Sequence, residues 1–209
     1  MTEPLRPPWH LLVITLVIMV ALGISPEADR LTWFMETVPV MIGLAILIPS
    51  WKTFPFTTLT YYLITFHAIV LMVGGHYTYA EVPWGNQLQE AFDLSRNYYD
   101  RFAHVIQGFV PAIIAREILI RLKVMKQGGW MFLFVTSFCL AFSALYEMIE
   151  WWAAIFTETG AEAFLGTQGD PWDTQWDMFL AMIGAIFAQV LLGSYHDRKI
   201  AELEMRIHP

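Results

Sequence analysis

Acidic side chains and one histidine recur at helical spacing in three segments of the chain, and they are the residues best suited to carry chemistry. The three sets are Asp100, His104, Gln107 and Pro111; then Ser143, Glu147 and Glu150; and finally Asp170, Asp173 and Asp177. Intervals of three and four residues place the members of each set on one face of an α-helix. Carboxylate oxygens and an imidazole suit cations such as Mg²⁺, Mn²⁺, Ca²⁺ or Zn²⁺, and the same groups can transfer protons as general acids and bases.

Most of these residues also have a structural interpretation. Asp170 is suited to cap a helix that begins at Pro171, and Asp173 would then favour the dipole of the first turn. Asp100 and His104, the first two residues of the first set, can serve as polar groups at a membrane interface. Glu147 and Glu150 are harder to explain in this way, because their structural role would be hydrogen bonding between helices, and a membrane helix rarely needs two carboxylates for it.

The composition indicates an integral membrane protein. Of the 209 residues, 56% are apolar and only 15% are charged, whereas a soluble domain carries about a quarter charged residues. This hydrophobicity excludes a disordered chain, and 12 Lys and Arg against 19 Asp and Glu exclude a nucleic-acid partner. A lone cysteine, Cys139, excludes a disulfide framework, a cysteine-ligated zinc and an iron–sulfur cluster.

Six stretches are long and apolar enough to be membrane-spanning helices, each of which needs about 20 residues. They cover residues 9–24, 33–48, 56–75, 102–122, 130–156 and 176–195. The backbone has no hydrogen-bond partners in lipid, so each stretch must be helical. The first stretch is short and follows Arg6, which also fits a signal peptide, although Ser25-Pro26-Glu27 lacks a clean cleavage site. We expect an all-α polytopic membrane helix bundle with six transmembrane helices, forming a single domain over residues 1–209, with membrane lipids as its surroundings.

The distribution of basic residues predicts the orientation. Eight Lys and Arg lie in the N-terminus, the second and fourth loops and the C-terminus, whereas three lie in the other loops. By the positive-inside rule, both termini should be cytoplasmic. The loop over residues 76–101 should contain an amphipathic helix in the outer interface, because Trp84, Leu88, Phe92 and Tyr99 fall near helical spacing.

The last three spans are expected to pack together around a polar pocket that opens to the outer side, because their three polar sets lie at the same end. Small residues continue the last polar stripe and permit close helix contact, namely Ala181, Gly184 and Ala188. His76, at the outer end of the third span, is a weaker candidate for this pocket, and His67 is expected to be structural. Arg101 is the basic residue expected beside the pocket, whereas Arg116 should reach the inner interface or pair with Glu117.

Three runs of sequence resemble the YjdF family of bacterial inner membrane proteins. They are Asp-Arg-Phe-Ala-His-Val-Ile-Gln-Gly-Phe at 100–109, Tyr-Glu-Met-Ile-Glu-Trp-Trp at 146–152, and Leu-Gly-Thr-Gln-Gly-Asp-Pro-Trp-Asp-Thr-Gln-Trp-Asp-Met at 165–178. The resemblance implies a multi-pass protein of the bacterial inner (plasma) membrane and implies no particular activity.

A looser likeness is to VanZ-like membrane proteins of glycopeptide resistance. That pattern is matched in order by Asp100, His104, Glu147, Asp173, Asp177 and Gly184. The chain departs from it at Trp151-Trp152 and lacks the expected arginine and asparagine around the last aspartates. This likeness favours the last three spans as the place of the site.

The leading hypothesis is an outward-facing carboxylate and histidine site that binds a divalent metal ion and acts on a lipid or envelope precursor. The expected metal ligands are Asp100, His104, Glu147, Asp173 and Asp177, and the expected catalytic acid/base groups are Glu147, Glu150 and His104. A small cation- or proton-coupled transporter and a non-catalytic accessory subunit with an unknown protein partner are the alternatives. A transporter would need a polar path through the inner halves of these helices, where the sequence offers Arg116, Glu117 and Gln189.

Overall fold

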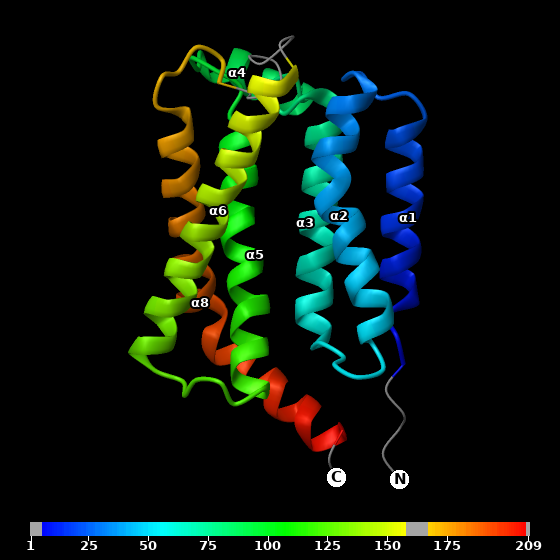
Figure 1. Cartoon of the computed structure of the whole chain (residues 1–209), viewed down its shortest axis with the longest axis vertical. Helices are drawn as coiled ribbons and strands as arrows, with labels where there is room; N and C mark the ends of the chain where they lie inside the picture. The colour runs from blue at the N-terminus through cyan, green and yellow to red at the C-terminus, as the bar shows by residue number, and fades with distance from the viewer. Residues whose placement is uncertain (1–5, 158–166, 208–209) are drawn as a thin grey trace.

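The computed structural model describes residues 6–157 and 167–207, and within these ranges the chain is all-α, as predicted. The helices are α1 (Trp9–Ile24), α2 (Arg30–Ser50), α3 (Thr58–Tyr77), α4 (Pro83–Phe92), α5 (Tyr99–Arg121), α6 (Gly129–Thr157) and α8 (Asp173–Ile207). The long helices run side by side as a bundle, and the start of α1 and the end of α8 lie at the same end of it (Figure 1).

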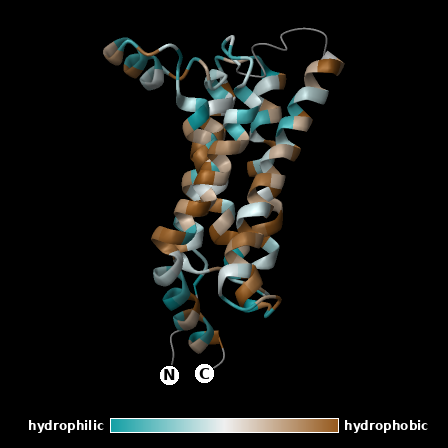
Figure 2. Ribbon diagram, turned by 90° about the vertical axis from the view of Figure 1, so that its left-hand side faces the viewer, coloured by the Kyte–Doolittle hydropathy of each residue, from teal (hydrophilic) through white to brown (hydrophobic). Residues whose placement is uncertain are grey.

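Five of the described helices, α2, α3, α5, α6 and α8, are long and apolar enough to cross a membrane. The remaining predicted span, over residues 9–24, is α1, which has 16 residues and is therefore about 24 Å long, shorter than the ~30 Å hydrocarbon core. Hydrophobic residues gather over the middle of the bundle and hydrophilic residues toward its two ends (Figure 2). The chain is thus a polytopic membrane bundle.

Helix α8 is much longer than the predicted span over residues 176–195, because it begins at Asp173 and continues to Ile207. The additional turns are charged and carry no hydropathy signal. They are held in place by ion pairs, since Lys199 contacts Glu202 within the helix at 2.8 Å and Arg121 of α5 contacts Glu204 at 2.7 Å. The sequence therefore located the apolar part of this helix and missed its polar extension.

The helices form two halves (Figure 1). One half consists of α1, α2 and α3, and the other of α5, α6 and α8. Among the described helices, the extensive contact between the halves is the packing of α3 against α5. The closest contact within a half is between α5 and α8. A Cβ atom on Gly108 would overlap the backbone carbonyl of Ala181, and one on Gly184 would overlap that of Val105. The predicted close contact along the small-residue stripe of α8 is therefore confirmed.

The predicted helix in the loop over residues 76–101 is also confirmed. It is α4, which lies at the end of the bundle opposite the termini (Figure 1). Its apolar residues Trp84, Leu88 and Phe92 are exposed. Asp93, in the left-handed region with φ 50°, ends α4, so Tyr99 belongs instead to α5 and is buried.

Candidate functional site

Four of the predicted site residues meet around one imidazole at the end of the bundle opposite the termini. The Nε2 atom of His104 lies 3.6 Å from Asp100 Oδ1, 3.8 Å from Glu147 Oε1 and 3.9 Å from Asp177 Oδ1. All four side chains belong to residues that are buried. Asp100 and His104 are one turn apart on α5, and the close packing of α5 on α8 brings Asp177 beside them.

Three of these residues have the geometry of a cation site. Asp100, His104 and Asp177 each offer one ligand atom, and the three atoms lie within 4.8 Å of one another. Asp177 Oδ1 and Glu147 Oε1 are buried and have no hydrogen-bond partner among the described residues. A buried polar atom without a partner costs about 1–3 kcal/mol, and more when it is charged. A bound cation would remove this cost.

A small cavity lies beside the cluster and is shared by both halves of the bundle. Its lining consists of Glu36, Leu71, Tyr79, Asp100, Ala103, His104, Gln107, Tyr146, Glu150 and Asp177. Its volume is about 20 Å³, which is room for a single water molecule. Glu150 therefore faces the cavity, whereas Glu147 contacts His104.

Glu36 of α2 is part of this site and was not predicted from the sequence. It is 3% exposed, and its Oε2 atom accepts a hydrogen bond of 3.1 Å from the hydroxyl of Tyr146 on α6. The available signal was its position, because Glu36 is the one ionisable residue within the predicted span over residues 33–48 and such residues usually face a functional interior.

The rim of the site, at the end of the bundle opposite the termini, contains two arginines rather than the single Arg101 that was expected. Arg96, which precedes α5, pairs with Asp173 and also lies 3.8 Å from Asp100 Oδ2, while Arg101 pairs with Asp170. Asp173 thus contacts arginines instead of His104. Although burial opposes the charge of Arg96, its ion pairs with Asp173 and Asp100 raise its pKa above the usual value.

Asp170 lies in the turn before α8. The helix begins at Asp173 and not at Pro171, so Asp170 is not its immediate N-cap. Its side chain still accepts a hydrogen bond of 2.9 Å from the amide of Trp172. This bond, together with Arg101, holds the pKa of Asp170 below its ordinary value. His76, the weaker candidate, instead places its Nδ1 atom 2.8 Å from the carbonyl oxygen of Leu22.

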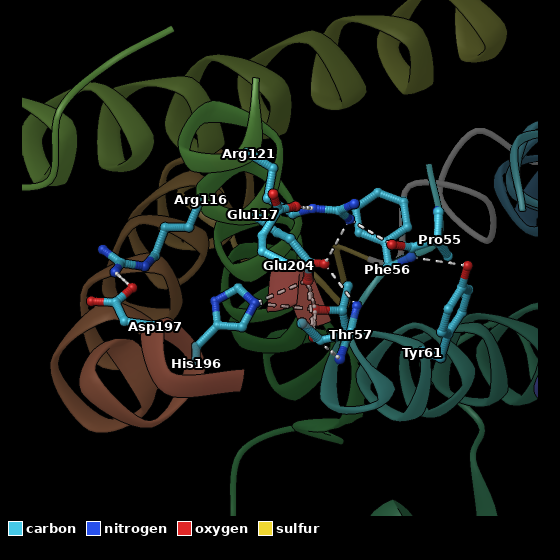
Figure 3. Close-up of polar contacts among 11 residues, drawn as sticks. Pro55, Phe56, Thr57, Tyr61, Arg116, Glu117, Arg121, His196, Asp197 and Glu204 are labelled. Atoms are coloured by element: carbon cyan, nitrogen blue, oxygen red, sulfur yellow. Dashed lines mark hydrogen bonds and ion pairs between the residues drawn. The ribbon is translucent and has the colours of Figure 1, made fainter. Parts of the chain in front are cut away.

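A second group of buried ionisable residues lies toward the end of the bundle that holds the termini (Figure 3). Glu117 is fully buried and accepts hydrogen bonds from the Thr57 amide at 2.7 Å, from the Thr60 hydroxyl at 2.6 Å and from His196 Nε2 at 3.0 Å. Of the two alternatives for Arg116, the structure does not show the pairing with Glu117, since Arg116 contacts Asp197 at 2.6 Å, toward the end of the bundle that holds the termini. Consecutive helical residues do not face each other, which explains the difference.

Between the two groups, the described core is mostly apolar. Its fully buried side chains include Ala112, Ile113, Ala185 and Ala188. Two buried polar residues interrupt it, namely Ser143 and Gln189, and the amide of Gln189 donates a hydrogen bond of 3.0 Å to Thr136 Oγ1. The ionisable residues of α5 and α8 thus form two separate groups in the part of the chain that the structure describes.

Comparisons with known proteins agree with this architecture. A family model described as "Predicted membrane protein (DUF2238)" matches residues 7–198. The "Inner membrane protein YjdF" of Escherichia coli (strain K12) is 48% identical over 203 residues, which cover 96% of each chain. The resemblance to the YjdF family is confirmed, although Leu165 and Gly166 of its third run lie outside the described residues. No solved structure matches the chain significantly.

Proposed function

We propose that this chain, which belongs to the DUF2238 family of predicted membrane proteins and is a multi-pass inner membrane protein, binds a divalent cation at its buried carboxylate and histidine cluster and uses it in chemistry on a lipid or envelope precursor. The observation that carries the proposal is the convergence of Asp100, His104 and Asp177, whose ligand atoms lie within 4.8 Å of one another. Buried oxygens without partners beside them support it.

The proposal includes six transmembrane helices with both termini in the cytoplasm. An even number of spans requires both ends of the chain on one side, and the start of α1 and the end of α8 lie at the same end of the bundle (Figure 1). The excess of Lys and Arg at that end supports a cytoplasmic location. The cluster then lies at the periplasmic end.

The depth of the cluster suits a lipid substrate. His104 is five residues after the first residue of α5, which places it about 8 Å along the helix axis. This depth corresponds to the boundary between headgroups and acyl chains, where a site can reach the polar part of a lipid. The rim arginines Arg96 and Arg101 offer positive charge to an anionic headgroup.

The groups around the cluster fit metal-assisted acid/base chemistry. A divalent cation held by Asp100, His104 and Asp177 would polarise an ester or phosphate oxygen and lower the pKa of a bound water. Glu147 lies 3.8 Å from His104 and would complete the ligand set or take a proton. Glu150 lines the cavity that has room for one water, which suits a general acid or base. Asp173 would act indirectly, by holding Arg96 in place.

A transporter is supported less well. It needs a polar path across the membrane, and the buried residues between the two ionisable groups of the described chain are mostly apolar, including Ile113 and Ala185, with Ser143 and Gln189 as isolated polar residues. No specific observation favours an accessory subunit.

Equilibrium cation binding tests the proposal. The purified protein in nanodiscs is titrated with Mn²⁺, Zn²⁺, Mg²⁺ and Ca²⁺, and Asp177→Asn and Glu147→Gln are compared with Glu90→Gln, which changes an exposed acid on α4. We expect one site per chain and at least a tenfold weaker affinity in the first two variants, about 1.4 kcal/mol. Equal binding by all three variants, or no binding of any cation by the wild type, would overturn the proposal.

The chemical step is tested in cells. Lipids and envelope precursors are compared by mass spectrometry between cells that carry the wild type and cells that carry Asp177→Asn at equal protein level. Accumulation of one lipid or precursor class in the variant is the expected result. Identical profiles would count against an enzymatic role while leaving cation binding to its own test.

A further inference from the structure

The two halves of the bundle are joined firmly at the end that holds the termini. The carboxylate of Glu117 on α5 accepts hydrogen bonds from the amide and hydroxyl of Thr57 at 2.7 and 2.9 Å, and from the hydroxyl of Thr60 at 2.6 Å. The Nε2 atom of His196 on α8 donates to the same carboxylate at 3.0 Å. Figure 3 shows Thr57, Glu117 and His196 pointing toward one another where the two halves of the bundle meet. Charged hydrogen bonds in a dry interior are strong, so this end is a rigid joint.

At the opposite end, the hydroxyl of Tyr99 on α5 donates a hydrogen bond of 2.7 Å to the carbonyl oxygen of Val70 on α3, whereas α2 and α6 are connected differently. Helices α2 and α6 do not pack extensively on each other in the described part of the chain, and a hydrogen bond of 3.1 Å from Tyr146 to Glu36 spans from one to the other. Both residues line the cavity beside the cation cluster. One hydrogen bond between α2 and α6 is a weaker connection than the four that converge on Glu117 at the other end.

Two further features suit an opening at this place. Pro39 lies inside α2, three residues after Glu36, and a proline removes one backbone hydrogen bond and permits a helix to bend. The residues beside Tyr146 on α6 include the exposed apolar side chains Leu145 and Ile149. A parting of α2 from α6 would therefore connect the cavity to the hydrocarbon of the outer leaflet and not to water.

The cavity itself requires such a movement if it is to admit a substrate. At about 20 Å³ it has room for one water and none for a lipid headgroup. We infer that the outer part of α2 is a lateral gate, which bends at Pro39, breaks the hydrogen bond between Tyr146 and Glu36, and admits the hydrocarbon chain of a lipid from the outer leaflet. The gate would let a lipid reach the proposed site, so its biological role rests on the proposed function, but its opening does not require a bound cation.

Distances between spin labels in nanodiscs test the gate. In a Cys139→Ala background, one pair of labels replaces the exposed residues Phe34 and Ile149 near the outer ends of α2 and α6, and a control pair replaces Ile46 and Leu133 near the inner ends. Each pair is measured in three proteins. They are the wild type, Tyr146→Phe, which removes the donor, and Glu36→Gln, which keeps an acceptor.

We expect Tyr146→Phe to add a longer distance for the outer pair and to leave the inner pair unchanged, with Glu36→Gln resembling the wild type. An outer distance that is unchanged in Tyr146→Phe would overturn the gate. Equal broadening of both pairs would also overturn it, because it would mean a general loosening of the bundle.

The occupant is tested with a phospholipid that carries a photoactivatable group in its acyl chain. We expect labelling of the α3 peptide that contains the cavity residue Leu71, several-fold stronger in Tyr146→Phe. No labelling of that peptide in either protein would contradict lipid access. Cation binding is measured on the same samples, so that binding without opening refutes only the gate, and opening without binding refutes only the proposed function.

Discussion

The contact between α5 and α8 gives the sharpest link between the fold and the site. Gly184 lies where a Cβ atom would overlap the carbonyl oxygen of Val105, and backbone cannot turn away as a side chain can. Carbon and oxygen atoms in helix contacts normally lie about 3.3–3.6 Å apart, so Gly184→Ala requires the two helices to separate by roughly 1 Å or more. Such overpacking costs about 1–3 kcal/mol of unfolding free energy.

The same separation reaches the cation cluster, because Asp177 lies on α8 while Asp100 and His104 lie on α5. Metal ligands are held within about 0.2 Å of their preferred distances, so a shift of roughly 1 Å should weaken cation binding at least tenfold, about 1.4 kcal/mol. We therefore expect Gly184→Ala to lower both the thermal stability and the cation affinity of the protein.

The matched control is Gly43→Ala on α2, where a Cβ atom meets nothing within 4 Å. Alanine is the better helix former, so this change should be neutral or stabilising by up to ~1 kcal/mol. Thermal unfolding followed by circular dichroism and calorimetric cation titration are carried out on both variants. If Gly184→Ala matches Gly43→Ala in both measurements, the close α5–α8 contact does not position the site.

Two further substitutions test the cap of α2 and the hydrogen bonds that converge on Glu117. Asp29 caps α2 and accepts hydrogen bonds from Thr32, which lower its pKa below the ordinary value. The stability that Asp29 contributes is therefore present above about pH 4 and is lost as the pH falls through the lowered pKa of the folded state. Asp29→Ala should lower the free energy of unfolding by about 1 kcal/mol at pH 7, and by progressively less in thermal melts below pH 4. Glu117→Leu leaves His196 and both threonine donors without their acceptor and should lower the free energy of unfolding by about 3–5 kcal/mol. The control, Glu202→Gln, changes an exposed ion pair and should cost less than ~1 kcal/mol. Equal denaturation midpoints for Glu117→Leu and Glu202→Gln would refute the rigid joint.

The membrane architecture could be predicted because lipid leaves the backbone few choices. A long apolar run must be a helix, and hydropathy therefore located the spans. The ends were harder, since the charged turns of α8 beyond Tyr195 give no hydropathy signal and are fixed by contacts such as that between Arg121 and Glu204. His196 was missed for the same reason, because it follows the predicted end of its span.

The cation cluster could be predicted in part because helical spacing is a local property. It correctly placed Asp100 above His104, and the shared depth of the three segments brought Glu147 and Asp177 to them. Contacts between halves are not local. Glu36 has no partner at helical spacing in its own segment, and its contact with Tyr146 exists only in the packed bundle.

The rim illustrates the same limit. Arg96 lies in a loop, where no periodicity indicates the direction of its side chain, and its ion pair with Asp173 could not be predicted from the sequence. Arg116 and Glu117 are adjacent in the sequence and do not pair, because consecutive residues of a helix point in different directions.

The most direct test is an experimental structure of the protein with Mn²⁺, in which anomalous scattering locates the ion. The prediction is one strong peak bounded by Asp100, His104 and Asp177, which Asp177→Asn abolishes while the fold is retained. A peak elsewhere, such as at the exposed acidic loops, or a cluster without any peak at saturating Mn²⁺, would contradict a cation site in this membrane protein.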